Sequence, residues 1–516
     1  MSPGLTLNLG QRSKSVRAPC LLKTVYWIVG ACALHGQVIS GWAFGGADHR
    51  LHYLPDARGN TIMDFSSAGY RAGGIALPTA AVSTRLRPEA GDNTARIQMA
   101  LDQATGAVVL AAGEYDLAGT LSITRSGVVL RGEKGASIRL TGKPHCFLEI
   151  HGSGTWSEEG PPAPILDTYV PAGGSRFRVR GGSEFHPGDH VLVLRPVTAA
   201  WIHFMGMGIP AADNQRQSWM RPGEVIRTDR IIDSVEGDTV TLDAPMSDAL
   251  DSQFAAASLV RYSFPGRIAE VGVEGLRVTA AFDDLIPLAR YAIVHMDAVE
   301  DGWAQDLEIN TSQDGIVIGP SAKRLTLTNL RVAHPTMQSG SAEAVDFTLQ
   351  GTQILFDRCR VTGEGSWPIV VRPGATGPLV VLNSTAELGG VAPDQPWATG
   401  LLVDGGKFPG GTEGRPAIAF SSRTNAGSSQ EWGIGWSVAW NVNSPFLLIP
   451  QPPGALNWCI GCIGTPVTTG GTPNGIFDPL GTMVSPSSLY LQQLRDRLGP
   501  DAVRSIGYSG SAAKLL

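Results

Sequence analysis

The chain has 516 residues, and its 64 glycines, 35 prolines and only 17% charged residues favour turn-rich β structure over helical bundles. The formal net charge is −6, and no run of Lys and Arg interleaved with aromatic residues follows residue 30, so nucleic acid is not an expected partner. A local cluster of Arg or Lys in a cleft can still attract an anionic polymer.

Residues 1–45 have the pattern of a signal peptide or an N-terminal anchor. Four basic residues precede an apolar stretch over 24–44, in which small residues near Ala43 suit a signal peptidase. A retained membrane anchor is an alternative, because the stretch approaches spanning length. Processing as a lipoprotein at Cys32 is another. We therefore expect an exported protein, periplasmic or extracellular, with no membrane span after this segment.

A short amphipathic helix is predicted after Asp92, with Ile97, Ala100 and Leu101 on one face. Three short strand patterns follow it, over 108–111, 120–123 and 127–130. A helix in this position would cover the open end of the first coil of a solenoid.

Residues 169–260 have a different sequence pattern, in which predicted strands are separated by Gly-rich turns and by a polar, aromatic loop over 201–221. We interpret this region as a β-rich insertion. The expected organisation is thus a single domain over 46–516 that carries the insertion within it.

A phrase of alternating apolar residues around a polar or small corner recurs in the second half of the chain, at Val271–Val278, Leu325–Val332 and Ile354–Val361. Two further stretches fit the same frame more loosely. The aligned positions Leu276, Leu307, Leu330, Cys359 and Ser384 lie 31, 23, 29 and 25 residues apart. Such spacings are typical of the coils of a β-helix.

A second strand pattern follows each phrase, so two strands are expected in each repeat. A propeller would need longer periods, and a sandwich would show no repeat. The sequence therefore predicts an all-β chain folded as a right-handed parallel β-helix, with each coil stacked on the next.

Several segments of the chain carry a resemblance to known proteins: Asp64–Tyr70 followed by Leu77-Pro78, Gly91–Thr94, Ser126–Gly132, Trp436–Trp440 and Pro452–Trp458. They resemble segments of secreted proteins of the pectate-lyase superfamily. The resemblance spans nearly the whole mature chain and implies the β-helix fold. It is much less specific for the reaction, because the superfamily includes lyases, hydrolases, epimerases and phage tailspikes.

One departure from the expected pattern bears on catalysis. Relatives are expected to carry Gly-Pro-His just ahead of the Trp-Ala-Thr-Gly element, whereas this chain has Ala392-Pro393-Asp394. If that histidine is catalytic in the relatives, this protein has lost it or works differently.

The catalytic candidates come from the second repeated strand and its surroundings. Elimination from a uronate polymer needs a cation, a base and an acid, whereas hydrolysis needs two carboxyls. Stacked coils align equivalent side chains in rows about 4.8 Å apart. A solvated face with ordinary ion pairs is the alternative interpretation. The candidates are Asp314, Glu343, Asp346, Arg372, Asp404, Arg423, His334 and His295.

Aromatic rings and imidazoles that could stack on or bind sugars are a second group. Four other tryptophans, at 432, 436, 440 and 458, are spaced like packing residues. No metal site is predicted, and the cofactor stays open; calcium at Asp283-Asp284 is weighed against a solvated turn. The candidates for substrate binding are Trp201, His203, Trp219, Trp367 and Trp397.

These patterns leave three functions open, each with a polysaccharide as partner. The first is an exported polysaccharide lyase, with an Arg or Lys as the cation. The second is a glycoside hydrolase that uses two of the carboxylates. The third is a non-catalytic glycan-binding or structural β-helix, suggested by the missing histidine. Epimerase or transferase chemistry is also open, and the oligomeric state is not predicted.

Overall fold

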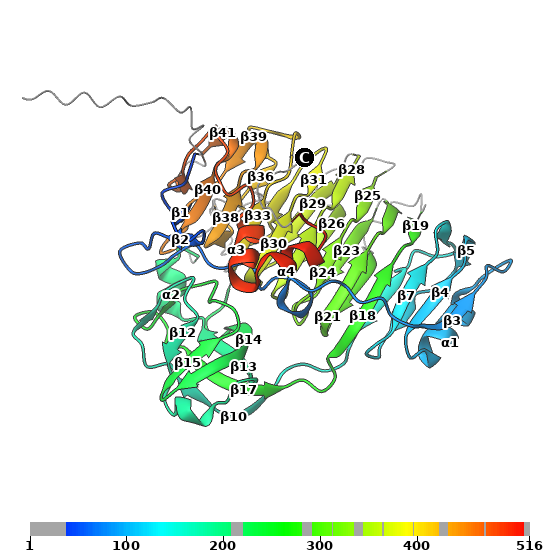
Figure 1. Cartoon of the computed structure of the whole chain (residues 1–516), viewed down its shortest axis with the longest axis horizontal. Coiled ribbons are helices and arrows are strands. Elements are labelled where there is room, and N and C mark those ends of the chain that lie inside the picture. The colour runs from blue at the N-terminus through cyan, green and yellow to red at the C-terminus, as the bar shows by residue number, and fades with distance from the viewer. Residues whose placement is uncertain are drawn as a thin grey trace, which may run out of the picture. The chain divides into compact units, whose positions relative to one another are not determined.

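A computed structural model describes residues 38–207, 220–280, 291–311, 313–334, 344–363, 366–395, 397–422, 432–468 and 471–509. All elements named below belong to the compact unit Val38–Leu516. The strands of successive coils stack along one axis and form three long parallel sheets (Figure 1). This arrangement confirms the predicted right-handed parallel β-helix.

The largest sheet has thirteen strands. Its pairings are all parallel, and neighbouring strands come from successive coils. Its strands are β3 (Val82–Leu86), β4 (Ala107–Leu110), β7 (Val129–Gly132), β18 (Ile268–Glu274), β21 (Val299–Gln305), β24 (Thr326–Thr328), β27 (Ile354–Asp357), β30 (Thr376–Leu382), β33 (Ala398–Asp404), β37 (Ile434–Gly435), β38 (Ser437–Trp440), β40 (Asn457–Ile460) and β42 (Ile476–Phe477).

The second sheet has seven strands and follows the first within each coil. Its strands are β5 (Gly113–Leu117), β8 (Ala136–Leu140), β19 (Arg277–Ala280), β22 (Glu308–Thr311), β25 (Arg331–Ala333), β28 (Arg360–Thr362) and β31 (Thr385–Ala386). The third sheet has ten strands. These are β6 (Leu121–Ile123), β9 (Leu148–His151), β20 (Ala292–Asp297), β23 (Asp314–Ile318), β26 (Ala344–Leu349), β29 (Ser366–Val371), β32 (Val391–Pro393), β36 (Ile418–Ala419), β39 (Asn443–Leu448) and β41 (Ile463–Val467).

A coil therefore has three strands, and the expectation of two was wrong. Each recurring phrase contains two strands and the corner between them, as in β18 and β19. The corner residue is left-handed on three successive coils, at Asn329 (φ 53°), Arg358 (φ 56°) and Asn383 (φ 45°). Asn adopts this conformation at lower cost than most residues. A single corner residue therefore turns the chain from one sheet into the next.

The aligned positions of the phrase form the predicted interior column. Leu276, Leu307, Leu330 and Cys359 are buried in one hydrophobic cluster that fills the β-helix. Ser384 continues the column, and its hydroxyl accepts a hydrogen bond from the Cys359 amide at 3.2 Å. Because each coil buries its apolar side chains against its neighbours, the regular spacing of the sequence becomes a continuous core.

The predicted capping helix is α1 (Thr94–Gln103). Its buried residues Ile97 and Leu101 join the core cluster of the β-helix. The Gln98 side chain donates to the Ser122 carbonyl at 3.0 Å and accepts from the Ser122 amide at 2.8 Å. These bonds satisfy backbone groups of β6 at the end of its sheet.

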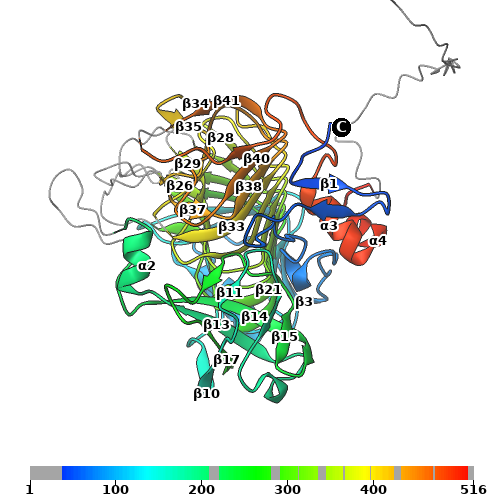
Figure 2. The ribbon, with the colours of Figure 1, turned by 90° about the vertical axis from the view of Figure 1, so that its left-hand side faces the viewer.

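The predicted β-rich insertion lies between β9 and β18. Its main sheet has six antiparallel strands, and α2 (Ala199–Phe204) follows one of them. Figure 2 shows it on one side of the β-helix, next to the thirteen-stranded sheet. The strands are β10 (Ser157–Pro164), β12 (Arg176–Arg178), β13 (His190–Pro196), β14 (Val225–Glu236), β15 (Thr239–Leu242) and β17 (Ser258–Ser263), with the pair β11 (Tyr169–Val170) and β16 (Leu250–Asp251).

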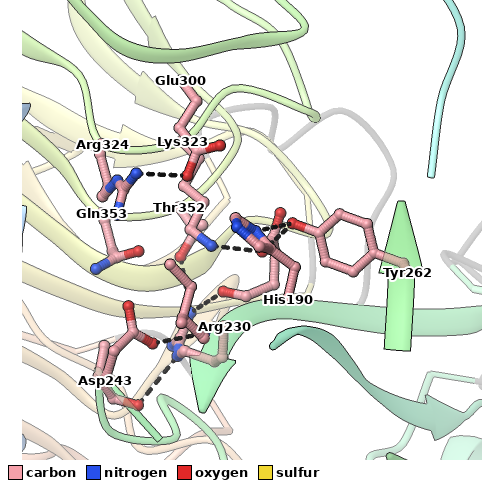
Figure 3. A network of polar contacts seen from close by, with 12 residues as sticks. His190, Arg230, Asp243, Tyr262, Glu300, Lys323, Arg324, Thr352 and Gln353 are labelled. Carbon is pink, nitrogen blue, oxygen red and sulfur yellow. Dashed lines mark hydrogen bonds and ion pairs between the residues drawn. The ribbon is translucent and has the colours of Figure 1, made fainter. Parts of the chain in front are cut away.

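A buried charge network joins the insertion to the β-helix (Figure 3). Asp229 of β14 accepts from Lys323 Nζ at 2.7 Å and from Arg267 Nη2 at 2.8 Å. Arg230 donates to the Gly377 carbonyl at 2.5 Å and to Thr352 Oγ1 at 3.0 Å. Burial alone would raise the pKa of Asp229, but the charges of Lys323 and Arg267 hold it well below its usual range.

The first described residues, from Ala43 on, and the helices near the other end of the described chain pack together on the outer face of the thirteen-stranded sheet (Figure 1). The helices are α3 (Leu489–Leu498) and α4 (Pro500–Ser505), and a hairpin of β1 (Ala43–Gly45) and β2 (Leu51–Tyr53) packs in the same hydrophobic cluster. The Gln493 side chain accepts from the Phe65 amide and donates to the Met63 carbonyl, both at 2.9 Å. Among the described residues, no helix is long and apolar enough to cross a membrane.

Candidate functional site

Asp314, His334 and Asp346 come together where β23 and β26 begin in the ten-stranded sheet. The Asp314 carboxylate accepts from the Val345 amide at 2.8 Å, which ties the two coils to each other. His334 follows β25 directly, and its Nε2 donates to Asp346 Oδ1. All three residues are buried. The structure thus groups two carboxylates and one imidazole from three of the predicted site positions.

The environment of His334 favours its charged form. Burial alone would lower the pKa of His334, but the bound Asp346 carboxylate, the Thr311 carbonyl and the Asp314 charge together raise it above its ordinary value. His334 therefore holds a proton more strongly than an exposed histidine does.

Arg372 and Asp394 form an ion pair beyond the far ends of β29 and β32. The Arg372 side chain is one-third exposed, so its guanidinium is accessible on this face. Asp394 occupies the position where the resemblance implies a histidine, and here it accepts from the guanidinium.

Asp404 lies away from these groups. It ends β33 in the thirteen-stranded sheet, where its carboxylate accepts from Ser488 Oγ and from the Tyr490 amide, both at 2.7 Å. Burial raises its pKa to about 7. The spacing of the repeated strand pattern predicted that Asp404 lies on one face with the other acids. This prediction was wrong, because Asp404 belongs to a different sheet and holds the start of α3.

The remaining catalytic candidates are dispersed or lie outside the described residues. His295 is half-buried on β20, and its register neighbours are Glu149 of β9 and Val317 of β23. Glu343 and Arg423 lie outside the described residues.

The described tryptophan candidates are buried. Trp201 and Trp397 line one small pocket, in which the Arg195 guanidinium lies 4.4 Å from the centre of the Trp201 ring and Trp397 donates to Asp248 at 2.8 Å. The Arg415 guanidinium lies 4.4 Å from the centre of the Trp367 ring.

His203 is exposed on α2, and Trp219 lies outside the described residues. The tryptophans at 432, 436, 440 and 458 are buried, as predicted. None of the described tryptophan candidates therefore presents a freely exposed ring to a sugar.

Sequence reasoning missed a groove of about 710 Å³ on the outer face of the seven-stranded sheet. Four of its charged lining residues come from the position after the interior column, and Arg358 comes from the position before it. The four are Arg277, Glu308, Arg331 and Arg360. The signal was present in the sequence, because three recurring phrases carry Arg before their last valine. Among the described residues, no group of three His, Cys, Asp or Glu side chains could hold a metal ion. The Asp283-Asp284 pair lies outside that part of the chain.

Comparisons with known proteins find similar solved structures, among them two phage tailspike proteins and one epimerase module. No protein-family model matches the sequence, and no curated protein does. The tailspike protein gp49 from Pseudomonas phage LKA1 is 14% identical, with a TM-score of 0.39 over 76% of this chain and 72% of that one. A double mutant of the tailspike protein of E. coli bacteriophage HK620 is 10% identical, with a TM-score of 0.39 over 86% and 69%. The A-module of the mannuronan C-5 epimerase AlgE4 from Azotobacter vinelandii is 12% identical, with a TM-score of 0.35 over 75% and 76%.

The grouped side chains have a defined chemical capacity. An imidazole that is hydrogen-bonded to a carboxylate and has a raised pKa can give up a proton and regain it, which is the task of a general acid or base. The exposed guanidinium of Arg372 can neutralise an acidic substituent on a ligand.

Proposed function

We propose that this chain is a carbohydrate-active β-helix protein that acts on a polysaccharide outside the cell, and that it cleaves this polymer by β-elimination. The observation that carries the proposal is the buried hydrogen bond between His334 and Asp346, with the Asp314 charge close enough to raise the pKa of His334 as well. Clusters of titratable groups with perturbed pKa values are characteristic of functional sites.

In the proposed reaction, the polymer lies across the strands of the ten-stranded sheet. Elimination removes the C5 proton of a uronate to a base, breaks the bond from C4 to the glycosidic oxygen and leaves a double bond between C4 and C5. His334 supplies the proton that the leaving oxygen takes up, and the neighbouring carboxylates raise its pKa. Arg372 neutralises an acidic group of the bound polymer.

The test is an activity assay on polygalacturonate, alginate and hyaluronan, with dextran and xylan as neutral polymers. A lyase raises both the ultraviolet absorbance of unsaturated uronates and the number of reducing ends. A glycoside hydrolase raises only the reducing ends. His334→Gln should abolish the ultraviolet signal, whereas the matched control Asp404→Asn, in a different sheet, should keep it. Absence of products from every polymer would overturn the proposed cleavage.

Non-catalytic glycan binding is the second candidate, and the Asp394 position favours it. Where the resemblance implies a histidine, this chain has a carboxylate that is bound to Arg372. Retardation of the protein in gels that contain an acidic polysaccharide, without any product, would support this function over cleavage.

Export is part of the same proposal. It is supported by the basic and apolar pattern of residues 1–45, of which residues 1–37 lie outside the described part of the chain. Cell fractionation followed by N-terminal sequencing tests it, and an unprocessed protein in the cytoplasm would overturn it.

A further inference from the structure

The groove on the seven-stranded sheet lies on a different face from the proposed catalytic group. Strands β19, β22, β25, β28 and β31 cross its floor, and corner residues such as Asn329 and Asn383 also line it. Because the strands stack about 4.8 Å apart, the groove offers a similar set of side chains at each step along the β-helix axis. Such a periodic surface suits a periodic ligand.

Its charges follow the strand register. Arg277 pairs with Glu308, and Glu308 pairs with Arg331 on the next strand. The Glu308 carboxylate accepts from Arg277 Nη2 at 2.8 Å and lies 3.5 Å from Arg331 Nη1. These three side chains therefore alternate in sign across three coils.

The alternation stops at the next coil, where Arg331 and Arg360 are directly paired. Like charges on paired positions of adjacent strands destabilise a sheet. The two side chains are 63% and 58% exposed, so both guanidiniums are accessible. Arg360 Nη2 donates to Glu387 Oε1 at 2.9 Å, which leaves other N–H groups of this fork for a ligand.

We infer that the Arg331–Arg360 pair binds acidic groups of an anionic polysaccharide that lies along this groove. Two adjacent guanidiniums bind carboxylates or sulfates with charge-assisted hydrogen bonds, and the bound anions remove their mutual repulsion. Asn310, Thr362 and Thr385 also line the groove and have polar groups that suit sugar hydroxyls. This inference shares with the proposed function only the polysaccharide ligand, and it does not require cleavage.

A nucleic acid fits these observations less well. The chain has a net charge of −6, and Glu308 lies within the groove itself. Nucleic-acid surfaces are instead strongly basic and neutralise a continuous row of phosphates.

The experiment measures binding of the full chain to polygalacturonate and dextran sulfate, with dextran as the neutral polymer and duplex DNA as the other polyanion. The test variant is Arg331→Gln/Arg360→Gln. Its matched control is Arg176→Gln, which removes an exposed arginine of the insertion that is paired with Glu236. Calorimetry gives Kd, and circular dichroism with thermal unfolding shows that each variant is folded.

We expect the unaltered protein to bind at least one acidic polymer, more weakly as salt is added, and not to bind dextran. The double variant should raise Kd by about tenfold or more, and the control should leave it unchanged. The polymer that binds identifies the acidic group as carboxylate or sulfate.

Unchanged Kd in the folded double variant, equal binding of dextran, or tighter binding of DNA than of both acidic polymers would overturn the inference. Cleavage of the same polymers is read separately. A protein that binds through the groove and produces no unsaturated ends overturns the lyase proposal and supports the groove. A protein that produces unsaturated ends, while its double variant keeps the Kd of the unaltered protein, overturns the groove inference and supports the lyase proposal.

Discussion

His334 and Asp346 form a buried hydrogen-bonded ion pair that joins the end of β25 to β26. The two residues belong to neighbouring sheets, so the pair fixes the position of the seven-stranded sheet against the ten-stranded sheet at this coil. Its strength depends on the charge of the imidazole, and therefore on pH.

The first prediction concerns this pH dependence. The folded-state pKa of His334 is raised above the unfolded value of about 6.5, so the stabilisation is fully present below about pH 6.5 and is lost as pH rises through the folded pKa. Asp346→Asn should lower the free energy of unfolding by about 3 kcal/mol below pH 6.5 and flatten its pH dependence above that. Urea unfolding over a pH series measures both. An unchanged pH profile would show that the imidazole charge does not stabilise this corner.

The second prediction concerns Asp404. Its folded-state pKa of about 7 lies above the unfolded value of about 3.9. The associated stability is present below about pH 4 and is lost as pH rises to about 7, because the buried carboxyl must then ionise. Asp404→Asn should remove this loss, so the variant should be more stable than the unaltered protein at neutral pH. Asp233→Asn, at an exposed position of β14, is the control and should leave the profile unchanged.

The third prediction concerns the charge network that holds the insertion. Asp229→Asn leaves the buried cations Lys323 and Arg267 without their shared carboxylate and should cost about 3–5 kcal/mol. Lys323→Met should cost less, because Arg267 still neutralises Asp229. Chemical unfolding gives the order of the two variants, and limited proteolysis of the insertion shows whether it detaches first. A larger loss for Lys323→Met would contradict this ranking.

The fourth prediction concerns the exposed cation of the proposed site. Arg372→Ala should lower kcat/KM on the cleaved uronate polymer by about 100-fold, because a transition-state charge loses its partner. It should also lower stability, because the mostly buried Asp394 carboxylate loses the guanidinium that it is paired with, so kcat/KM is compared on folded protein. Arg176→Ala serves as the control for removal of an exposed arginine. Full activity of Arg372→Ala would remove Arg372 from the site.

The fold could be predicted because it depends on a local pattern that repeats. Leu276, Leu330 and Cys359 recur at coil spacing, and the structure stacks them in one core. The number of strands in a coil could not be read in the same way. The corner is a single left-handed residue such as Asn329, so a strand, a corner and a second strand resemble one longer strand.

The candidate site was harder to predict because it depends on which sheet each strand joins. Asp346 and Asp404 follow similar sequence patterns, yet they lie in different sheets. The Trp397 indole donates to Asp248, which lies 149 residues earlier in the insertion, so this contact could not be read from the strand that carries Trp397. The groove was overlooked for a related reason: the arginines are visible in the sequence, but the direct pairing of Arg331 with Arg360 follows only from the register.

The contact between the two ends of the described chain affects how the protein can mature. Backbone groups of Phe65, Met63 and Ala68 find their partners in Gln493 and Tyr490, more than 400 residues later. Those early residues can therefore complete these hydrogen bonds only after residues 490–493 have been synthesised, while the coils between them can already stack. A chain that lacks α3 and α4 would therefore present the uncovered apolar surface of this cluster to chaperones and proteases.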